Sequence, residues 1–181
     1  WIGHHNDIAH WGLGLEATGG GGGPVSVEAK NWDFSKTPDI YDTAWQYDVI
    51  SKYPGDIEVK MSSRVRMGTK WIGTDGWVYV DRGRLDASNK EWIKGGFNSG
   101  KFKAYSSPGH QRNFIDSVKS RKETVAPAEN AHRSITPGHI AYVSHEIGRA
   151  IKWDPKKEVV IGDDKAQKIL YSLPYRGDWK I

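Results

Sequence analysis

Apolar and polar residues alternate along much of the first half of the chain, which is the period of a β-strand with one buried face. Residues 25–32 (VSVEAKNW) follow this pattern, and residues 43–50 (TAWQYDVI) are rich in aromatic and β-branched side chains. The segment 56–65 alternates apolar residues with charged or hydroxyl residues, and 70–80 contains two short strands about the turn Thr74-Asp75-Gly76. The pattern predicts an antiparallel sheet of at least four strands from about residue 25 to 81, with one face in water.

Near the two ends of the chain the spacing becomes that of helices. The opening residues predict a helix that ends around Gly12 or Gly14. Further helices are predicted at about 108–121 and 137–151, where Pro137 suits a first turn, and a short third one at about 163–172. The apolar positions that should cover the sheet are Phe114, Ile115, Val118, Ile140, Val143, Ile147, Ala150 and Ile151. The order predicts an α+β fold, an open and mainly antiparallel β-sheet with helices covering one face, in a single domain over residues 1–181.

Composition narrows the class of protein. The chain has 181 residues, 37% of them hydrophobic and 27% charged, and can bury a sizeable core. The formal net charge of +4 comes from basic and acidic residues mixed along the sequence, and no nucleic-acid recognition motif is present, so we expect no nucleic-acid partner. No apolar run has transmembrane length, so we expect no membrane association. The absence of cysteine excludes disulfides and thiolate chemistry but does not identify a compartment.

Five glycines at 19–23, followed by Pro24, could suggest a loop that cradles a phosphate. Such a loop must lead into the N-terminus of a helix, where backbone N–H groups point at the anion. Here the glycines lead into the strand pattern of residues 25–32. We therefore interpret them as a loose connector and expect no cofactor-binding residue in this chain.

Histidines carry the clearest candidate chemistry. His4 and Asp7 are three residues apart on the opening helix, so their side chains occupy neighbouring positions, whereas His5 and His10 point elsewhere. A carboxylate beside an imidazole can fix the tautomer needed for proton transfer, although a lone pair of this kind is more often a surface hydrogen bond. His132, His139 and His145 are not spaced to share one helix face, so no metal site is predicted.

Several blocks of the sequence resemble a known family. The run GHHNDIAHWGLG at 3–14 resembles the start of the C-terminal domain in the glucose-fructose oxidoreductase, inositol dehydrogenase and MocA (Gfo/Idh/MocA) family. The similarity continues in GTDGWVYVDRGRLDAS (73–88), HQRNFIDSVKSRKETVAPAENAHRS (110–134) and GRAIKWDPKKEVVIGDDKAQKIL (148–170), and in the closing PYRGDW. These collinear blocks cover most of the chain and look most like a subgroup of bacterial dehydrogenases.

The resemblance implies roles for two residues. His4 matches the family histidine that acts as general base on a sugar or cyclitol hydroxyl, and Asp7 matches an aspartate that accepts hydrogen bonds from substrate hydroxyls. NAD or NADP would be bound by an N-terminal Rossmann domain, of which this sequence has no part, so the chain alone is expected to be inactive. In the family the exposed face of the sheet commonly packs against another subunit, which implies a homo-oligomer.

A rival hypothesis from another class follows from the nine tryptophans. The chain could be a non-catalytic module that binds carbohydrate through exposed Trp and Tyr side chains, or an assembly domain. Against this, the aromatic residues are spread over predicted strands, helices and the C-terminal stretch instead of one region. The sequence does not distinguish glucose, a disaccharide, an inositol or an amino sugar as substrate.

Overall fold

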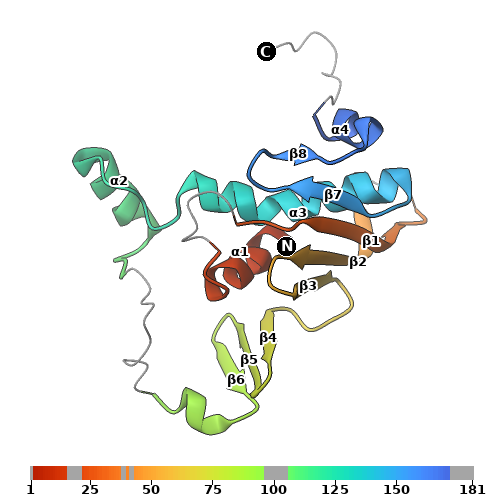
Figure 1. Ribbon diagram of the computed structural model, residues 1–181. Helices are drawn as coiled ribbons and strands as arrows, with labels where there is room; N and C mark the ends of the chain where they lie inside the picture. Colours follow the sequence, from red (N-terminus) through yellow and green to blue (C-terminus); the bar gives the residue numbers. More distant parts are fainter. Residues whose placement is uncertain (1, 16–21, 38–39, 41–42, 96–105, 172–181) are drawn as a thin grey trace. The chain divides into compact units, whose positions relative to one another are not determined.

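The computed structural model describes residues 2–15, 22–37, 40, 43–95 and 106–171 (Figure 1). These residues form two compact units. The first unit contains the described residues up to Met67 and those from Arg133 onward, and the second contains residues from Gly68 to His132. The prediction of a single domain stays a prediction.

The first unit is built on a five-stranded sheet in the order β3-β2-β1-β7-β8 (Figure 1). All four neighbouring pairs run antiparallel. Its elements are α1 (Ile2–Gly12), β1 (Ser26–Phe34), β2 (Ala44–Tyr53), β3 (Ile57–Ser62), α3 (Ala128–Ile147, which begins before Arg133), β7 (Ile151–Asp154), β8 (Val159–Val160) and α4 (Asp164–Tyr171). The predicted α+β fold with an open antiparallel sheet is confirmed.

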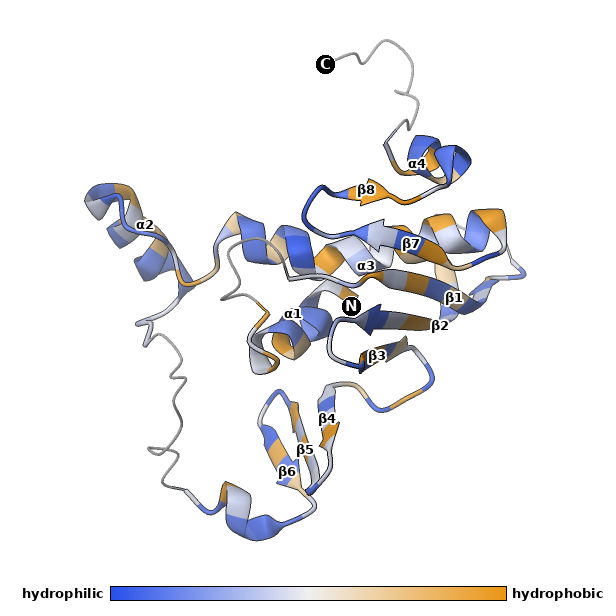
Figure 2. Ribbon diagram, in the orientation of Figure 1, coloured by the Kyte–Doolittle hydropathy of each residue, from blue (hydrophilic) through white to orange (hydrophobic). Residues whose placement is uncertain are grey.

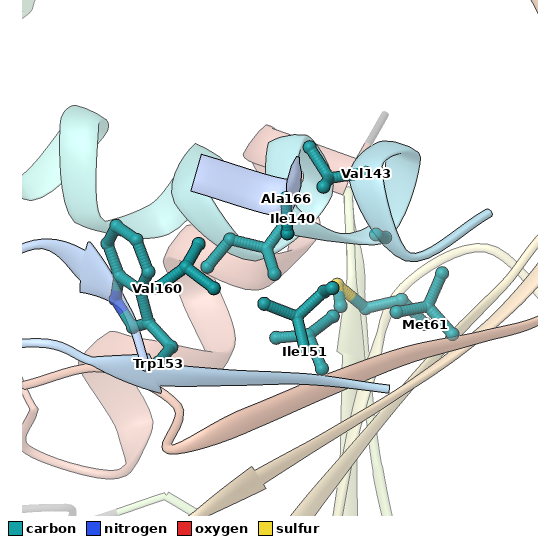
Figure 3. Close-up of a cluster of buried hydrophobic side chains, with 10 residues drawn as sticks. Met61, Ile140, Val143, Ile151, Trp153, Val160 and Ala166 are labelled. Carbon is teal, nitrogen blue, oxygen red and sulfur yellow. The ribbon is translucent and has the colours of Figure 1, made fainter. Parts of the chain in front are cut away.

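The core of this unit lies on one face of the sheet, where strand residues meet helices α3 and α4 (Figure 3). Val49, Ser51 and Tyr53 alternate toward this face of β2 and are buried, because successive side chains of a strand point to opposite faces. Apolar and polar residues alternate visibly along the strands in Figure 2. The buried cluster consists of Val27, Val49, Met61, Ile140, Ala141, Val143, Ile151, Trp153, Val160 and Ala166.

Ser144 of α3 forms a hydrogen bond to strand β1 of the sheet. Ser144 is 1% exposed, and its Oγ accepts a hydrogen bond from the Ala29 backbone N–H at 3.0 Å and donates to the Arg149 carbonyl at 2.7 Å. The β1–β2 register shifts between Ala29 and Asn31. The serine therefore satisfies a backbone donor next to a β-bulge, where the regular ladder is interrupted.

The C-terminal part of α3 differs from the prediction. The helix ends at Ile147 because Gly148 adopts a φ of +70° and the Arg149 N–H bonds back to the Ser144 carbonyl, as in a glycine-terminated helix. Ile151, expected on the helix, lies in β7 and is buried. Pro137 was expected in a first turn and instead lies inside α3, which begins nine residues earlier at Ala128.

The second unit has its own three-stranded sheet, β4 (Thr69–Gly73), β5 (Gly76–Asp81) and β6 (Arg84–Ala87), followed by η2 (Lys90–Ile93) and α2 (His110–Ser120). The sequence predicted that the strands at 70–80 would join the larger sheet, and this was wrong. The turn before Gly76 and the one at Gly83 (φ +81°) return the chain on itself, so the three strands pair with each other.

The predicted apolar side of α2 is exposed. Phe114, Ile115 and Val118 are 63%, 46% and 48% exposed. Within its own unit α2 is held by Asn113, whose Oδ1 accepts a hydrogen bond from the Val125 N–H at 2.9 Å. The prediction that this helix covers the larger sheet stays a prediction.

Candidate functional site

Helix α1 packs closely against α3, and small residues allow the approach. A Cβ atom at Gly3 would lie 3.1 Å from Ile135 Cδ1, and one at Gly138 would lie 3.2 Å from Ile2 Cγ2. Both distances are shorter than ordinary van der Waals contact, so each helix uses a glycine opposite an isoleucine of the other. This packing brings the polar residues of α1 within hydrogen-bonding distance of α3.

Ser134 of α3 holds two neighbouring residues of α1. Its Oγ donates a hydrogen bond to Asp7 Oδ1 at 2.7 Å, and its carbonyl accepts one from Asn6 Nδ2 at 2.8 Å. Ser134 and Asn6 are buried, at 1% and 2% exposure, whereas Asp7 is half-buried. One carboxylate oxygen of Asp7 is therefore fixed by a buried hydroxyl, while part of the side chain still meets solvent.

The two residues predicted for the site differ in their surroundings. His4 is exposed on α1, one turn before Asp7, as the spacing of three residues requires. Asp7 contacts α3 through Ser134. An exposed imidazole and a fixed carboxylate on one side of a helix can accept a proton and hold a hydroxyl group. The family resemblance implies these roles for His4 and Asp7, and the assignment stays a prediction.

His10, expected to point away from the site, is a buried structural residue. It is 1% exposed, and its Nε2 lies 2.7 Å from the Tyr53 hydroxyl and 3.3 Å from Asn6 Nδ2. The Ser134 carbonyl can only accept, so the Asn6 atom facing it is the NH2 group, and His10 Nε2 consistently acts as the acceptor with the proton on Nδ1. His10 thus joins α1 to β2.

Burial shifts the pKa values of His10 and Tyr53. Loss of hydration lowers the pKa of His10 from 6.5 to about 4, and the nearby Asp7 carboxylate opposes part of that shift. Burial likewise raises the pKa of Tyr53 well above its ordinary value, although the Asn6 side chain works in the opposite direction. Both groups are therefore neutral at physiological pH, and His10 serves the packing of α1.

The remaining candidate features within the described segments are the other histidines and the end of the glycine run. No group of three or more His, Asp or Glu side chains in that part of the chain could hold a metal ion. His145, on α3, has its ring 5.9 Å from that of Trp32 in a stacked arrangement. The end of the glycine run leads through Pro24 into strand β1 and not into a helix, so it does not provide the helix N-terminus that such a phosphate site uses. No helix of the described chain is long and apolar enough to cross a membrane.

Asn6, Ser134 and Tyr53 were missed by the sequence analysis. A local signal existed only for Asn6, which is four residues before His10 on the helix. The partners Ser134 and Tyr53 are 128 and 43 residues away from the α1 residues that they bond. Their roles depend on how α1 packs against α3 and β2.

Comparison with known proteins matches residues 97–181 to the oxidoreductase family, C-terminal alpha/beta domain. The predicted resemblance to the Gfo/Idh/MocA C-terminal domain is confirmed. No curated protein matches the chain. The matched oxidoreductase-family segment contains α2, α3, β7, β8 and α4, and it includes Ser134. Helix α1 precedes this segment, and the hydrogen bond from Ser134 to Asp7 joins the two.

Proposed function

We propose that this chain is the substrate-binding half of an NAD(P)-dependent oxidoreductase that acts on a hydroxyl group of a sugar, sugar derivative or cyclitol. The observation that carries the proposal is the 2.7 Å hydrogen bond from Ser134, within the matched oxidoreductase-family segment, to Asp7 on the helix that bears His4. It links the one part of the chain with a family match to the residues predicted for catalysis and binding.

In this proposal His4 is the general base. Oxidation of an alcohol removes a hydride from carbon and a proton from oxygen, and a bound nicotinamide supplies the hydride acceptor. Imidazole is the side chain best suited to accept the proton near neutral pH. His4 is exposed on α1, and the half-buried carboxylate of Asp7 can accept hydrogen bonds from neighbouring hydroxyls.

The nicotinamide cofactor would be held by another domain of the protein. The glycine run is followed by a strand, which does not fit a pyrophosphate site, and no other residue of the described segments suggests one. Calorimetric titration of this chain with NADH and NADPH should therefore show no heat of binding. Micromolar affinity for either nucleotide would contradict this assignment.

The test of the catalytic role uses an enzyme in which this chain is joined to its nucleotide-binding domain. Reduction of NAD and NADP is followed with a panel of sugars and cyclitols. His4→Ala should lower kcat by roughly 10² to 10⁴, the usual contribution of general acid–base catalysis, and leave the KM for the cofactor unchanged. His5→Ala, at the next helix position, is the matched control. Equal losses for both variants, or none for His4→Ala, would contradict the proposed role.

Assembly into a homo-oligomer through a sheet is a second part of the proposal. Ile72 of β4 is 78% exposed, and a large apolar side chain of this kind is typical of an interface core. Light scattering should detect an oligomer of the chain that Ile72→Asp weakens. If the chain instead assembles but no member of the panel is oxidised, the alternative of a non-catalytic module gains support.

A further inference from the structure

An open hollow lies at the end of the β1–β2 hairpin, away from the residues of α1. Its volume is about 600 Å³, within the range of roughly 300–1,000 Å³ that is usual for small-molecule sites. Trp32, Phe34 and Trp45 supply its aromatic surface. Trp45 is 74% exposed and Phe34 is 46% exposed, so both rings are accessible from solvent.

Two of the three rings, those of Trp32 and Phe34, contact neighbouring rings. The Trp32 ring lies 5.9 Å from His145, at an interplanar angle of 22°, and 5.9 Å from Tyr47. The ring of His145 also lies 5.6 Å from that of Phe34. Trp32 and Tyr47 pack against the buried core of the first unit, so this wall of the hollow rests on a rigid support.

Polar side chains surround the aromatic surface. Ser35, Lys36 and Gln46 line the hollow and are exposed. They offer hydroxyl, ammonium and amide groups, which together provide both donors and acceptors. Single exposed apolar residues are normal on protein surfaces, but here they share a hollow with a polar rim.

We propose that this hollow is a saccharide-binding subsite that takes a pyranose ring. A pyranose has a face of C–H groups, which stacks on an aromatic ring, and an edge of hydroxyls, which needs donors and acceptors. The faces of Trp45 and Phe34 match the first, and the rim of Ser35, Lys36 and Gln46 matches the second. Asp33 also lines the hollow, and its carboxylate accepts a hydrogen bond from the Arg64 guanidinium at 2.8 Å.

This subsite is separate from the residues proposed for catalysis. Neither His4 nor Asp7 lines the hollow, and the inference does not depend on their roles. The hollow would hold one sugar unit of a glycan without carrying out chemistry on it.

The experiment titrates this chain with methyl β-D-glucopyranoside, maltose and glucuronic acid, using saturation-transfer NMR and tryptophan fluorescence. We expect saturable binding of at least one sugar, with contacts to its C–H face. Trp45→Ala should weaken that binding by roughly tenfold, the equivalent of about 1.4 kcal/mol. Trp45→Phe keeps an aromatic face and should retain part of the affinity. Trp92→Ala, which removes a 41% exposed tryptophan of the second unit, is the matched control.

Three results would overturn the proposal. The first is the absence of saturable binding of all three sugars to the folded chain, and the second is binding that Trp45→Ala leaves unchanged. The third is an oligomer in light scattering that Trp45→Ala dissociates while no sugar binds, because the hollow would then be an interface between copies of the chain. A stronger response to glucuronic acid that Lys36→Ala abolishes would support the subsite and assign a role to the lysine.

Discussion

Helix α1 carries a histidine on each of two sides, and the two histidines lie in different surroundings. On one side His4 is exposed, and Asp7 is fixed by Ser134 but still partly open to solvent. On the other side His10 is buried and bonded to Tyr53, with Asn6 beside it. Two histidines six positions apart thus face different environments. What a histidine can do depends on the surface that its helix position faces, and the spacing along the sequence gives only the position.

The comparison predicts a large loss of stability when His10 is removed and almost none when His4 is removed. His10→Ala should lower the free energy of unfolding by about 3 to 4 kcal/mol, because it opens a cavity and leaves the Tyr53 hydroxyl without its partner. His4→Ala should change it by less than about 0.5 kcal/mol, as for most exposed positions. Urea unfolding followed by circular dichroism measures both. Equal losses would show that the two sides of α1 are not distinct.

A pH series sharpens the same contrast. The pKa of His10 is near 6.5 in the unfolded chain and about 4 in the folded chain. Between these two pH values protonation of His10 therefore favours the unfolded state. The free energy of unfolding should fall by roughly 3 kcal/mol from this residue as the pH falls from 6.5 to 4. Below that range the contribution of His10 should change no further. His10→Gln cannot titrate there and should remove this slope. His5→Gln is the control, and an unchanged slope in His10→Gln would contradict a buried neutral His10.

On the exposed side the expected effect is on substrate binding. In the joined enzyme, Asp7→Ala should raise the KM for the sugar or cyclitol by the equivalent of about 1.5 to 3 kcal/mol, the contribution of a charged hydrogen bond. Asp7→Asn keeps an oxygen that can accept from Ser134 Oγ but loses the charge, so it separates positioning from binding. Steady-state kinetics of both variants checks the prediction. A KM unchanged in Asp7→Ala would remove Asp7 from the substrate site.

The periodicity of the sequence predicted most of the elements, and it did so where each element is long enough to show its period. The strand alternation of residues 56–65 and the helical spacing of α3 both appear in the structure. Strands β7 and β8 were missed because they have four and two residues, and because Ile147 and Ile151 are separated by one helical turn. The conformation of Gly148 ends the helix between these two isoleucines.

The candidate site likewise has residues that the sequence could identify and residues that it could not. His4 and Asp7 lie close in sequence, so local spacing and a family resemblance could identify them. The partners that distinguish the two sides of α1, Ser134 and Tyr53, are ordinary residues of a helix and a strand. Their contribution arises only from tertiary packing, which no local pattern in one sequence encodes.

The smallest effect concerns the hydrogen bond that makes the buried side of α1 polar. Tyr53→Phe removes the hydroxyl 2.7 Å from His10 Nε2 but keeps the ring, whose edge contact with His10 has a centroid distance of 5.5 Å. The loss of unfolding free energy should be about 1 kcal/mol, since the Asn6 amide at 3.3 Å still offers His10 a donor. Tyr142→Phe, at a 41% exposed position of α3, should cost close to nothing under the same denaturation assay.

In a double-mutant cycle with His10→Phe, the Tyr53→Phe substitution should lose most of its cost, because the hydroxyl then has no imidazole to bond. If the two substitutions were simply additive, the hydrogen bond would contribute nothing, and the buried side of α1 would be held by packing alone.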